Sequence, residues 1–262
     1  MKGLHMTKQN LSIKKGQIYR LGEHTLACGD STDFEFITKA LGEVKIDLIL
    51  TDPPYGVSYV ESKKDLGSAP SSEKEIVNDS ISDDSQYKEF TKQWLSPIIP
   101  NLASYNTYYI FNGDKMLFAM HDAIKDLKFK FSQLLVWIKS QPVLGRKDYM
   151  PQHELIVYGW YGKHAFRKSK DKSLLFEPKP SKNKLHPTMK PISLLRRLIL
   201  NSTAIGNVVY DPFAGSGSTL IACEQTKRKC ITVEFDPAYC ETIIKRFTKL
   251  TGKEAVLLSS DV

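Results

Sequence analysis

Short apolar runs alternate with segments of helical spacing along the chain, and this alternation restricts the possible folds more than any other feature. The runs are rich in β-branched residues and end at turn residues, as strands buried on both faces do. They lie at residues 24–28, 46–50, 107–111, 134–138, 154–158, 208–210 and 230–233. The segments of helical spacing lie at residues 34–41, 86–102, 115–127, 191–203, 218–225 and 237–250. The alternation predicts the α/β class, with a doubly wound, mostly parallel sheet.

The length of 262 residues is enough to bury a full core, and we expect a single domain over residues 1–262. Two polar stretches interrupt the alternation, at residues 60–84 and 162–186. Loops of this length are functional or disordered in most proteins. We expect residues 60–84 to be mobile, either as a lid over an active site or as a disordered insertion.

The composition argues against membrane, metal-binding and disulfide-stabilised classes. No apolar run reaches the roughly 18 residues that a membrane span needs, and the first fifteen residues are polar and basic. We therefore expect a soluble, cytoplasmic protein. The cysteines show no Cys-x-x-Cys pair and are predicted to be reduced core thiols without a metal. They are Cys28, Cys223, Cys230 and Cys240.

The positive charge of the chain is concentrated in one segment. The net charge is +8, and from Lys139 to Lys190 there are 12 basic and 4 acidic residues, so this segment holds the whole excess. Such a surplus suits a polyanion, because neutralised phosphates release condensed counterions. A solvated basic loop explains the same charge equally well.

The first candidate site follows the run at 46–50, where the chain continues as Thr51, Asp52, Pro53, Pro54 and Tyr55. The carboxyl ends of strands are the edge at which open α/β sheets bind ligands. The Asp52 carboxylate and the Pro53 carbonyl are acceptors, and prolines offer no competing N–H. Two rigid acceptors match an amino group, and Tyr55 offers a face on which a planar base can stack. These four residues, from Asp52 to Tyr55, are the predicted catalytic group, although an isolated Asp-Pro-Pro segment is also an ordinary turn.

The second candidate site is a glycine turn between the run at 208–210 and a helical segment. Glycines let the backbone approach a ligand, and the helix that follows offers unpaired N–H groups. No lysine precedes Ser218, which excludes a phosphate-binding Walker loop, and a third fingerprint glycine is absent. Glu234 favours a nucleoside, because an acidic side chain after the next strand can accept both ribose hydroxyls. The predicted ligand contacts are Asp211, Phe213, Ala214, Gly215, Ser216, Gly217, Ser218, Thr219, Glu234 and Phe235.

With both segments in view, the chain resembles the β class of amino-methyltransferases that act on DNA. In that class an Asp-Pro-Pro-Tyr segment precedes a Phe-x-Gly-x-Gly segment, and here Asp52 precedes Phe213 by 161 residues. The resemblance covers nearly the whole chain. It implies S-adenosylmethionine as cofactor and a Rossmann-like, seven-stranded, mostly parallel sheet with a reversed hairpin strand at one edge.

The resemblance also implies further cofactor residues. Residues 21–30 are similar to the family's strand that leads to an acidic residue near the cofactor adenine, which gives Asp30 that role. Residues 186–191 are similar to the family's His-Pro-Thr-x-Lys-Pro segment, which lies by the methionine end of the cofactor. The implied contacts there are His186, Thr188 and Lys190. Lys190 is then a candidate partner for the cofactor carboxylate.

The family resemblance favours adenine as the substrate base. Asp in the first position of the tetrapeptide is used mainly for N6 of adenine, and Ser mainly for N4 of cytosine, so Asp52 implies adenine. The expected activity is site-specific methylation of an adenine flipped out of double-stranded DNA. Two alternatives are N4-cytosine methylation and a catalytically silent DNA-binding module of the same fold.

DNA recognition is expected in the basic segment at about residues 140–186, since this family recognises its targets through variable segments. Lysines there can contact the phosphate backbone, and Arg146 and Arg167 can read guanine edges. Residues 137–139 and 153–154 are similar to the family's segment on the far side of the base pocket. The predicted DNA contacts are Lys139, Arg146, Lys147, Arg167, Lys168 and Lys170. Many relatives pair as dimers, so a homodimer is a further expectation.

Overall fold

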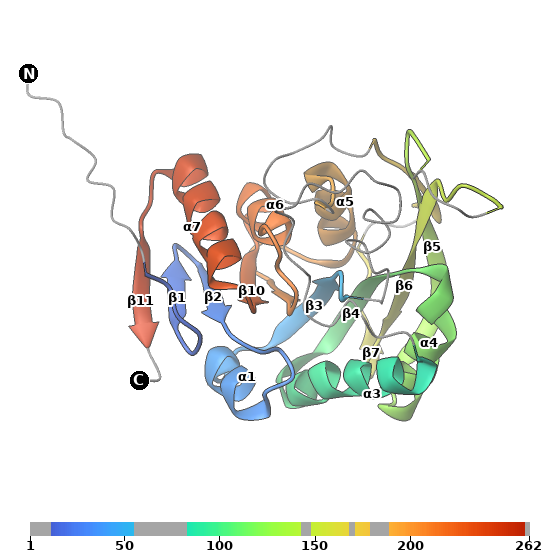
Figure 1. Cartoon of the computed structure of the whole chain (residues 1–262), viewed down its shortest axis with the longest axis horizontal. Coiled ribbons are helices and arrows are strands. Elements are labelled where there is room, and N and C mark those ends of the chain that lie inside the picture. Colours follow the sequence, from blue (N-terminus) through green and yellow to red (C-terminus); the bar gives the residue numbers. More distant parts are fainter. Residues whose placement is uncertain (1–11, 55–82, 143–147, 168–170, 179–188, 260–262) are drawn as a thin grey trace, which may run out of the picture.

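The computed structural model of the protein describes residues 12–54, 83–142, 148–167, 171–178 and 189–259 (Figure 1). Several predicted site residues lie outside the described residues: Tyr55, Arg146, Lys147, Lys168, Lys170, His186 and Thr188. The stretch at 60–84 also lies outside them, except for Asp83 and Asp84. Asp83 accepts the N–H groups of Ser85 and Gln86 and so caps α3 (Asp84–Leu95).

All seven predicted strands are present, and they form the centre of one mixed sheet. They are β2 (His24–Cys28), β3 (Ile46–Thr51), β4 (Leu102–Asn112), β5 (Lys130–Ile138), β6 (His153–Trp160), β9 (Val208–Asp211) and β10 (Lys229–Glu234). Strands β2, β10, β9, β3 and β4 are parallel in that order, and β6 runs antiparallel between β4 and β5. The mostly parallel α/β sheet and its reversed strand near one edge are confirmed.

The described residues contain four strands that the sequence did not predict. They are β1 (Ile18–Leu21), β7 (Lys163–His164), β8 (Leu174–Phe176) and β11 (Ala255–Ser259). Strands β1 and β11 extend the sheet beyond β2, β8 pairs with β5, and β7 pairs with the start of β4. Strands β7 and β8 are very short, and β11 is an edge strand with half-exposed side chains, so none has a long buried apolar run.

Helices cover both faces of the sheet (Figure 1). One face carries α1 (Phe34–Leu41), α3 and α4 (Leu117–Asp126), and the other carries α5 (Ile192–Ser202), α6 (Ser218–Thr226) and α7 (Pro237–Thr251). Each helix corresponds to one predicted segment, so the doubly wound arrangement is confirmed. The segment at 86–102 is divided into α3 and a 3-10 turn, η1 (Ser96–Asn101), because Pro97 and Pro100 interrupt the α-helical hydrogen bonds. A second 3-10 turn, η2 (Asp114–Met116), precedes α4.

Two hydrophobic clusters, one under each helical layer, form the core. Trp94 and Tyr108 are fully buried in the cluster beneath α1, α3 and α4, and Leu198 and Phe247 in the cluster beneath α5, α6 and α7. The four cysteines are buried and free, as predicted. In the described ranges, no helix is long and apolar enough to cross a membrane. These ranges also contain no group of three or more His, Cys, Asp and Glu side chains that could hold a metal ion.

Candidate active site

Both candidate sites lie at the same edge of the sheet, because the parallel strands that carry them end there. Asp52 follows β3, Asp211 ends the neighbouring β9, and Glu234 ends β10. The Thr51 hydroxyl donates a hydrogen bond of 2.8 Å to the Asp211 carboxylate. Residues 160 positions apart are thus joined directly, as the position rule for open α/β sheets predicts.

Asp52 is the first of four largely buried charged groups that lie in a row. The Lys190 ammonium donates to Asp52 Oδ2 and lies 3.0 Å from Glu154 Oε2. The Lys139 ammonium lies 2.7 Å from Glu154 Oε1. Glu154 is in β6 and Lys139 directly follows β5, so the reversed strand brings this pair to Asp52. The order of charges is therefore carboxylate, ammonium, carboxylate, ammonium.

Burial and neighbouring charges have opposing effects on the pKa values of these charged groups. Burial raises the pKa of Asp52 above its usual range, and Lys190 counteracts only part of that effect. Burial also acts to raise the pKa of Glu154, but Lys190 and Lys139 hold it below its usual range. For Lys190, burial acts to lower the pKa, yet Asp52 and Glu154 raise it above its ordinary value. Lys190 is therefore protonated at neutral pH.

One oxygen of Asp52 is available as an acceptor. Asp52 Oδ1 is buried and has no hydrogen-bond partner among the described residues. A buried acceptor without a partner is costly, and in a functional site it marks where a ligand donor belongs. Pro53 is buried next to it and Pro54 is partly buried, and neither contributes an N–H that would satisfy Oδ1. The geometry suits a ligand N–H group.

The glycine turn is held in place from several sides. Gly215 and Gly217 have φ values of +52° and +80°, which side-chain-bearing residues rarely adopt. A Cβ on Gly217 would lie 2.8 Å from Ile243 Cγ1 of α7, so close packing also requires glycine there. Arg246 donates to the Ser216 carbonyl and, at 3.0 Å, to the Ser216 hydroxyl. These two hydrogen bonds attach the turn to α7 at Ser216.

The other predicted residues of the turn are mostly buried. Asp211, Ala214, Ser218 and Thr219 are each less than a tenth exposed, and the Phe213 ring packs against two aromatic rings of α3. These rings are Phe90 and Trp94, with centroid distances of 5.8 Å and 5.5 Å. The side chains of the turn thus anchor it to both helical layers. The backbone of Gly215, which is partly exposed, is the part that a ligand can approach.

Glu234 joins the glycine turn to the start of α7. Its Oε2 accepts the Gly215 N–H at 2.7 Å, and its Oε1 accepts the Asp236 N–H at 2.9 Å. Burial raises the pKa of Glu234 to about 7 despite these two bonds. Each carboxylate oxygen can accept more than one hydrogen bond, so the predicted contact with two ribose hydroxyls is compatible with this geometry.

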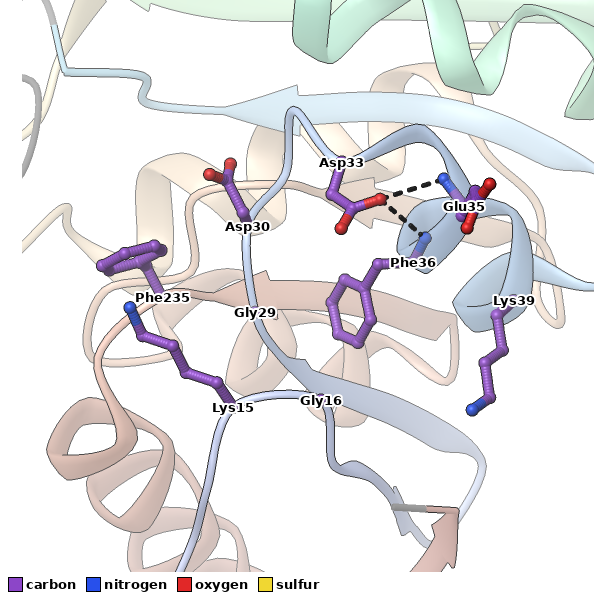
Figure 2. Close-up of a pocket in the computed structure, with 9 residues that line it drawn as sticks. All are labelled: Lys15, Gly16, Gly29, Asp30, Asp33, Glu35, Phe36, Lys39 and Phe235. Atoms are coloured by element: carbon purple, nitrogen blue, oxygen red, sulfur yellow. Dashed lines mark hydrogen bonds between the residues drawn. The ribbon is translucent and has the colours of Figure 1, made fainter. Parts of the chain in front are cut away.

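A pocket opens beside Glu234, at the ends of β2 and β10 (Figure 2). Figure 2 shows Asp30 and the Phe235 ring on the same side of this pocket, with Lys15 extending toward the ring. The Lys15 ammonium lies 3.2 Å from the centroid of Phe235. The other lining residues are Gly16, Gly29, Asp33, Glu35, Phe36 and Lys39. The pocket thus offers a carboxylate and an aromatic face close to Glu234.

Sequence reasoning did not find Lys15, and three other basic residues have contacts in the structure that it did not predict. Lys190 was expected to bind the cofactor carboxylate, but its ammonium lies between Asp52 and Glu154. Lys139 was expected to contact DNA, but it is buried and ion-paired. A strand-end lysine and its partner are charges of ordinary appearance in a sequence, and only the fold brings them together.

Arg167 was also expected to contact DNA, and the structure places it near the amino ends of the parallel strands. Its N–H donates to the carbonyl of Asn201, near the end of α5, at 2.6 Å. The preceding strand β7 pairs with Tyr105 and Asn106 in the amino-terminal part of β4. Asp52 lies at the other end of the parallel strands, so the backbone of Arg167 is not beside Asp52.

The chain belongs to the N6/N4 DNA methylase family, whose model matches residues 46–246. Among curated proteins, it is similar to the type II methyltransferase M.HpaI of Haemophilus parainfluenzae, with 29% identity over 79% of this chain and 70% of the relative. It is also similar to the type II methyltransferase M2.DpnII of Streptococcus pneumoniae, with 26% identity over 82% of this chain and 87% of that protein.

Solved structures of DNA methyltransferases share the fold. The M1.HpyAVI–SAM complex has 24% identity and a TM-score of 0.62, covering 84% of this chain and 97% of that chain. The cytosine-N4-specific PvuII DNA methyltransferase has 17% identity and a TM-score of 0.62, covering 88% and 94%. The fold is therefore shared with an enzyme that is specific for N4 of cytosine.

Proposed function

We propose that the chain transfers a methyl group from S-adenosylmethionine to N6 of an adenine flipped out of double-stranded DNA. The single observation that carries this proposal is the buried, unpartnered Asp52 Oδ1 beside Pro53, at the same sheet edge as the glycine turn and Glu234. An amine acceptor and a nucleoside-binding turn on adjacent strands are what methylation of a base amine requires.

The residues of the cofactor pocket fit S-adenosylmethionine. The Glu234 carboxylate can accept hydrogen bonds from the ribose hydroxyls, and the Phe235 ring can stack on the adenine. Asp30 can accept a hydrogen bond from the adenine amino group. The Gly215 backbone allows close approach beside the ribose. The similar M1.HpyAVI structure is described as a complex with SAM, which supports the same cofactor here. When bound, this cofactor supplies a methyl group on a positively charged sulfur.

The role of Asp52 and Pro53 is to prepare the amine. The lone pair of an exocyclic amine is delocalised into the base ring, which makes it a poor nucleophile. Hydrogen bonds from the amine to Asp52 Oδ1 and to the Pro53 carbonyl favour a pyramidal nitrogen with a localised lone pair. Nitrogen then forms the new bond to the methyl carbon as the bond from that carbon to sulfur breaks. The nitrogen afterwards loses one proton, for which the Asp52 carboxylate is the nearest acceptor.

The choice of adenine rests on the first residue of the tetrapeptide. Asp52 is the residue that the β class uses mainly for adenine, while the shared fold of the cytosine-specific PvuII enzyme supports N4-cytosine methylation as a second candidate. Reaction with unmethylated DNA, digestion to nucleosides and mass analysis will distinguish the two. N6-methyladenine supports the proposal, and N4-methylcytosine would replace it with the second candidate.

The partner and biological context follow from the relatives. Two similar proteins are named type II methyltransferases, which supports a site-specific enzyme of a restriction–modification system acting in the cytoplasm. The segment at 140–186 remains the proposed target-recognition region, with Arg146, Lys147, Lys168 and Lys170 as proposed phosphate or base contacts. A single catalytic domain over residues 1–262 and a homodimer are parts of the same proposal. Sedimentation with and without DNA tests the dimer.

A further inference from the structure

Asp52 and the three charged groups beside it are too well buried to be ordinary surface ion pairs. The side chains of Lys139 and Lys190 are 6% and 8% exposed, and those of Glu154 and Asp52 are 17% and 25% exposed. Charges in such surroundings interact strongly because little water screens them. Each of the four charged groups therefore affects the charge and position of its neighbour.

The stability of the fold alone does not explain why these four charged groups are buried together. Removing charged groups from water costs as much as their attraction returns, and apolar residues of similar size stabilise a core at least as well. The cation of Lys190 also lies 5.0 Å from the centre of the buried Phe111 ring, in a region that apolar side chains could fill. Both Asp52 Oδ1 and Glu154 Oε2 are buried without a hydrogen bond of good geometry, but Glu154 Oε2 has the Lys190 ammonium at 3.0 Å and Asp52 Oδ1 has no such neighbour among the described residues. Four largely buried charges next to this open acceptor atom indicate a role in the chemistry.

We infer that Lys190 and Glu154 are positioning residues that prepare Asp52 for the substrate amine. Lys190 binds Oδ2 and so turns Oδ1 toward the space for the base. Glu154 shares the same ammonium, which limits how far Lys190 neutralises Asp52. Lys139 balances the charge of Glu154 from the other side. This inference rests on the proposed function, in which Asp52 accepts a hydrogen bond from the substrate amine.

Two further titratable groups face Asp52 from other elements. Tyr87 of α3 is fully buried, and burial followed by the Asp52 charge raises its pKa well above the usual range. Asp211 of β9 has a pKa of about 6, raised mainly by burial and slightly by Asp52. Tyr87 is therefore neutral near pH 7, and Asp211 adds a negative charge above about pH 6. Neither is changed in the variants below, so each contributes equally to all the proteins compared.

The inference predicts opposite pKa changes in two variants. Glu154→Gln removes a negative charge next to Lys190, so the pKa of Asp52 falls. Lys190→Met removes the positive charge that contacts Asp52, so the pKa of Asp52 rises. A neighbouring charge at this distance shifts a pKa by about one unit or more. Damage to the packing alone would not shift the same group in opposite directions.

The direct test is a pH titration of Asp52 by carbon-13 NMR of the whole protein labelled at aspartate carboxyls, with the Asp52 signal assigned by its loss in Asp52→Asn. Lys245→Met is the matched control, because Lys245 is 72% exposed and pairs only with Glu241 among the described residues. Its Asp52 titration should equal that of the wild type. An Asp52 pKa that is unchanged in Glu154→Gln, or that moves the same way in both variants, would overturn the inference. Should Lys190→Met not fold, Glu154→Gln carries the test alone, because Gln keeps the size of Glu.

A second measurement separates this role from cofactor binding. If Lys190 positions Asp52, the Lys190→Met variant should bind S-adenosylmethionine at most about twofold more weakly than the wild type does. Its affinity for the decarboxylated analogue should fall by the same factor. A loss of about tenfold or more for S-adenosylmethionine alone would instead show that Lys190 binds the cofactor carboxylate. The titration needs no turnover, so a wild-type protein that methylates no base would contradict the proposed function without affecting the pKa result.

Discussion

The Thr51 hydroxyl donates a hydrogen bond of 2.8 Å to the Asp211 carboxylate, and so joins the residue before Asp52 to the first residue of the glycine turn. Asp211 also accepts the Phe213 N–H at 3.2 Å, and burial raises its pKa to about 6. Thr51 and Asp211 are both nearly fully buried. The proposed amine acceptor and the glycine turn are thus joined by one side-chain hydrogen bond.

We predict that Thr51→Val destabilises the protein and lowers the rate of methyl transfer. Valine keeps the size of threonine but leaves a buried carboxylate with one donor fewer, a loss of about 1–3 kcal/mol. Thr51→Ser is the control, because it retains the hydroxyl. Urea unfolding should show a lower midpoint for the valine variant only. Equal midpoints for Thr51→Val and the wild type would show that the bond contributes nothing.

Gly217→Ala should weaken both folding and cofactor binding. The alanine Cβ would meet Ile243 at 2.8 Å and adopt a φ of +80°, and each effect is unfavourable. Gly206→Ala is a matched control, because Gly206 has a φ of +81° and no atom within 4 Å of an added Cβ. Thermal unfolding should show a clearly larger loss for Gly217→Ala. Equal losses would mean that backbone conformation, not packing against α7, restricts the turn.

Cofactor binding should strengthen as pH rises through about 7. Burial raises the pKa of Glu234 to about 7, and ribose hydroxyls donate best to the ionised carboxylate. Titration calorimetry with S-adenosylhomocysteine from pH 6 to 8 should show rising affinity, and Glu234→Gln should bind more weakly with a flatter profile. An unchanged pH profile in Glu234→Gln would assign the titration to another group, for which Asp211, with a pKa of about 6, is the candidate.

The same pKa has the opposite effect on the stability of the free protein. A carboxyl whose folded pKa lies above its unfolded value contributes stability that is complete below about pH 4.5 and is lost as pH rises through about 7. Glu234→Gln should therefore remove a decrease in stability between pH 5 and 8. Urea unfolding at both pH values checks this sign independently of any ligand.

The layout of the fold was predictable because its main elements have local signals. Buried parallel strands are short apolar runs, and the six main helices carry regular spacing, so both were found from pattern alone. Edge strands such as β11 lack a buried run, and the prolines at 97 and 100 divide a segment whose spacing is otherwise helical. These errors concern the margins of the sheet and the ends of helices.

The charged site was only partly predictable. Asp52, Glu234 and the glycine turn follow strands, so their common location comes from the rule that parallel strands end at one edge. The ion pair between Lys190 and Asp52 joins residues 138 positions apart and leaves no local signal. Lys15 reaches Phe235 in the same way, from a turn before the first strand. Pairings between distant polar residues had to come from the structure.

The most direct test of the account is transfer of labelled methyl from S-adenosylmethionine to unmethylated DNA by the wild type and by Asp52→Ala. Asp122→Ala, on the exposed side of α4, is the control and should match the wild type. We predict that Asp52→Ala loses at least about 100-fold in rate, as expected when a group that stabilises the transition state is removed, while cofactor affinity stays within about threefold. Transfer by Asp52→Ala at the wild-type rate would contradict the assignment of Asp52 as the acceptor of the substrate amine.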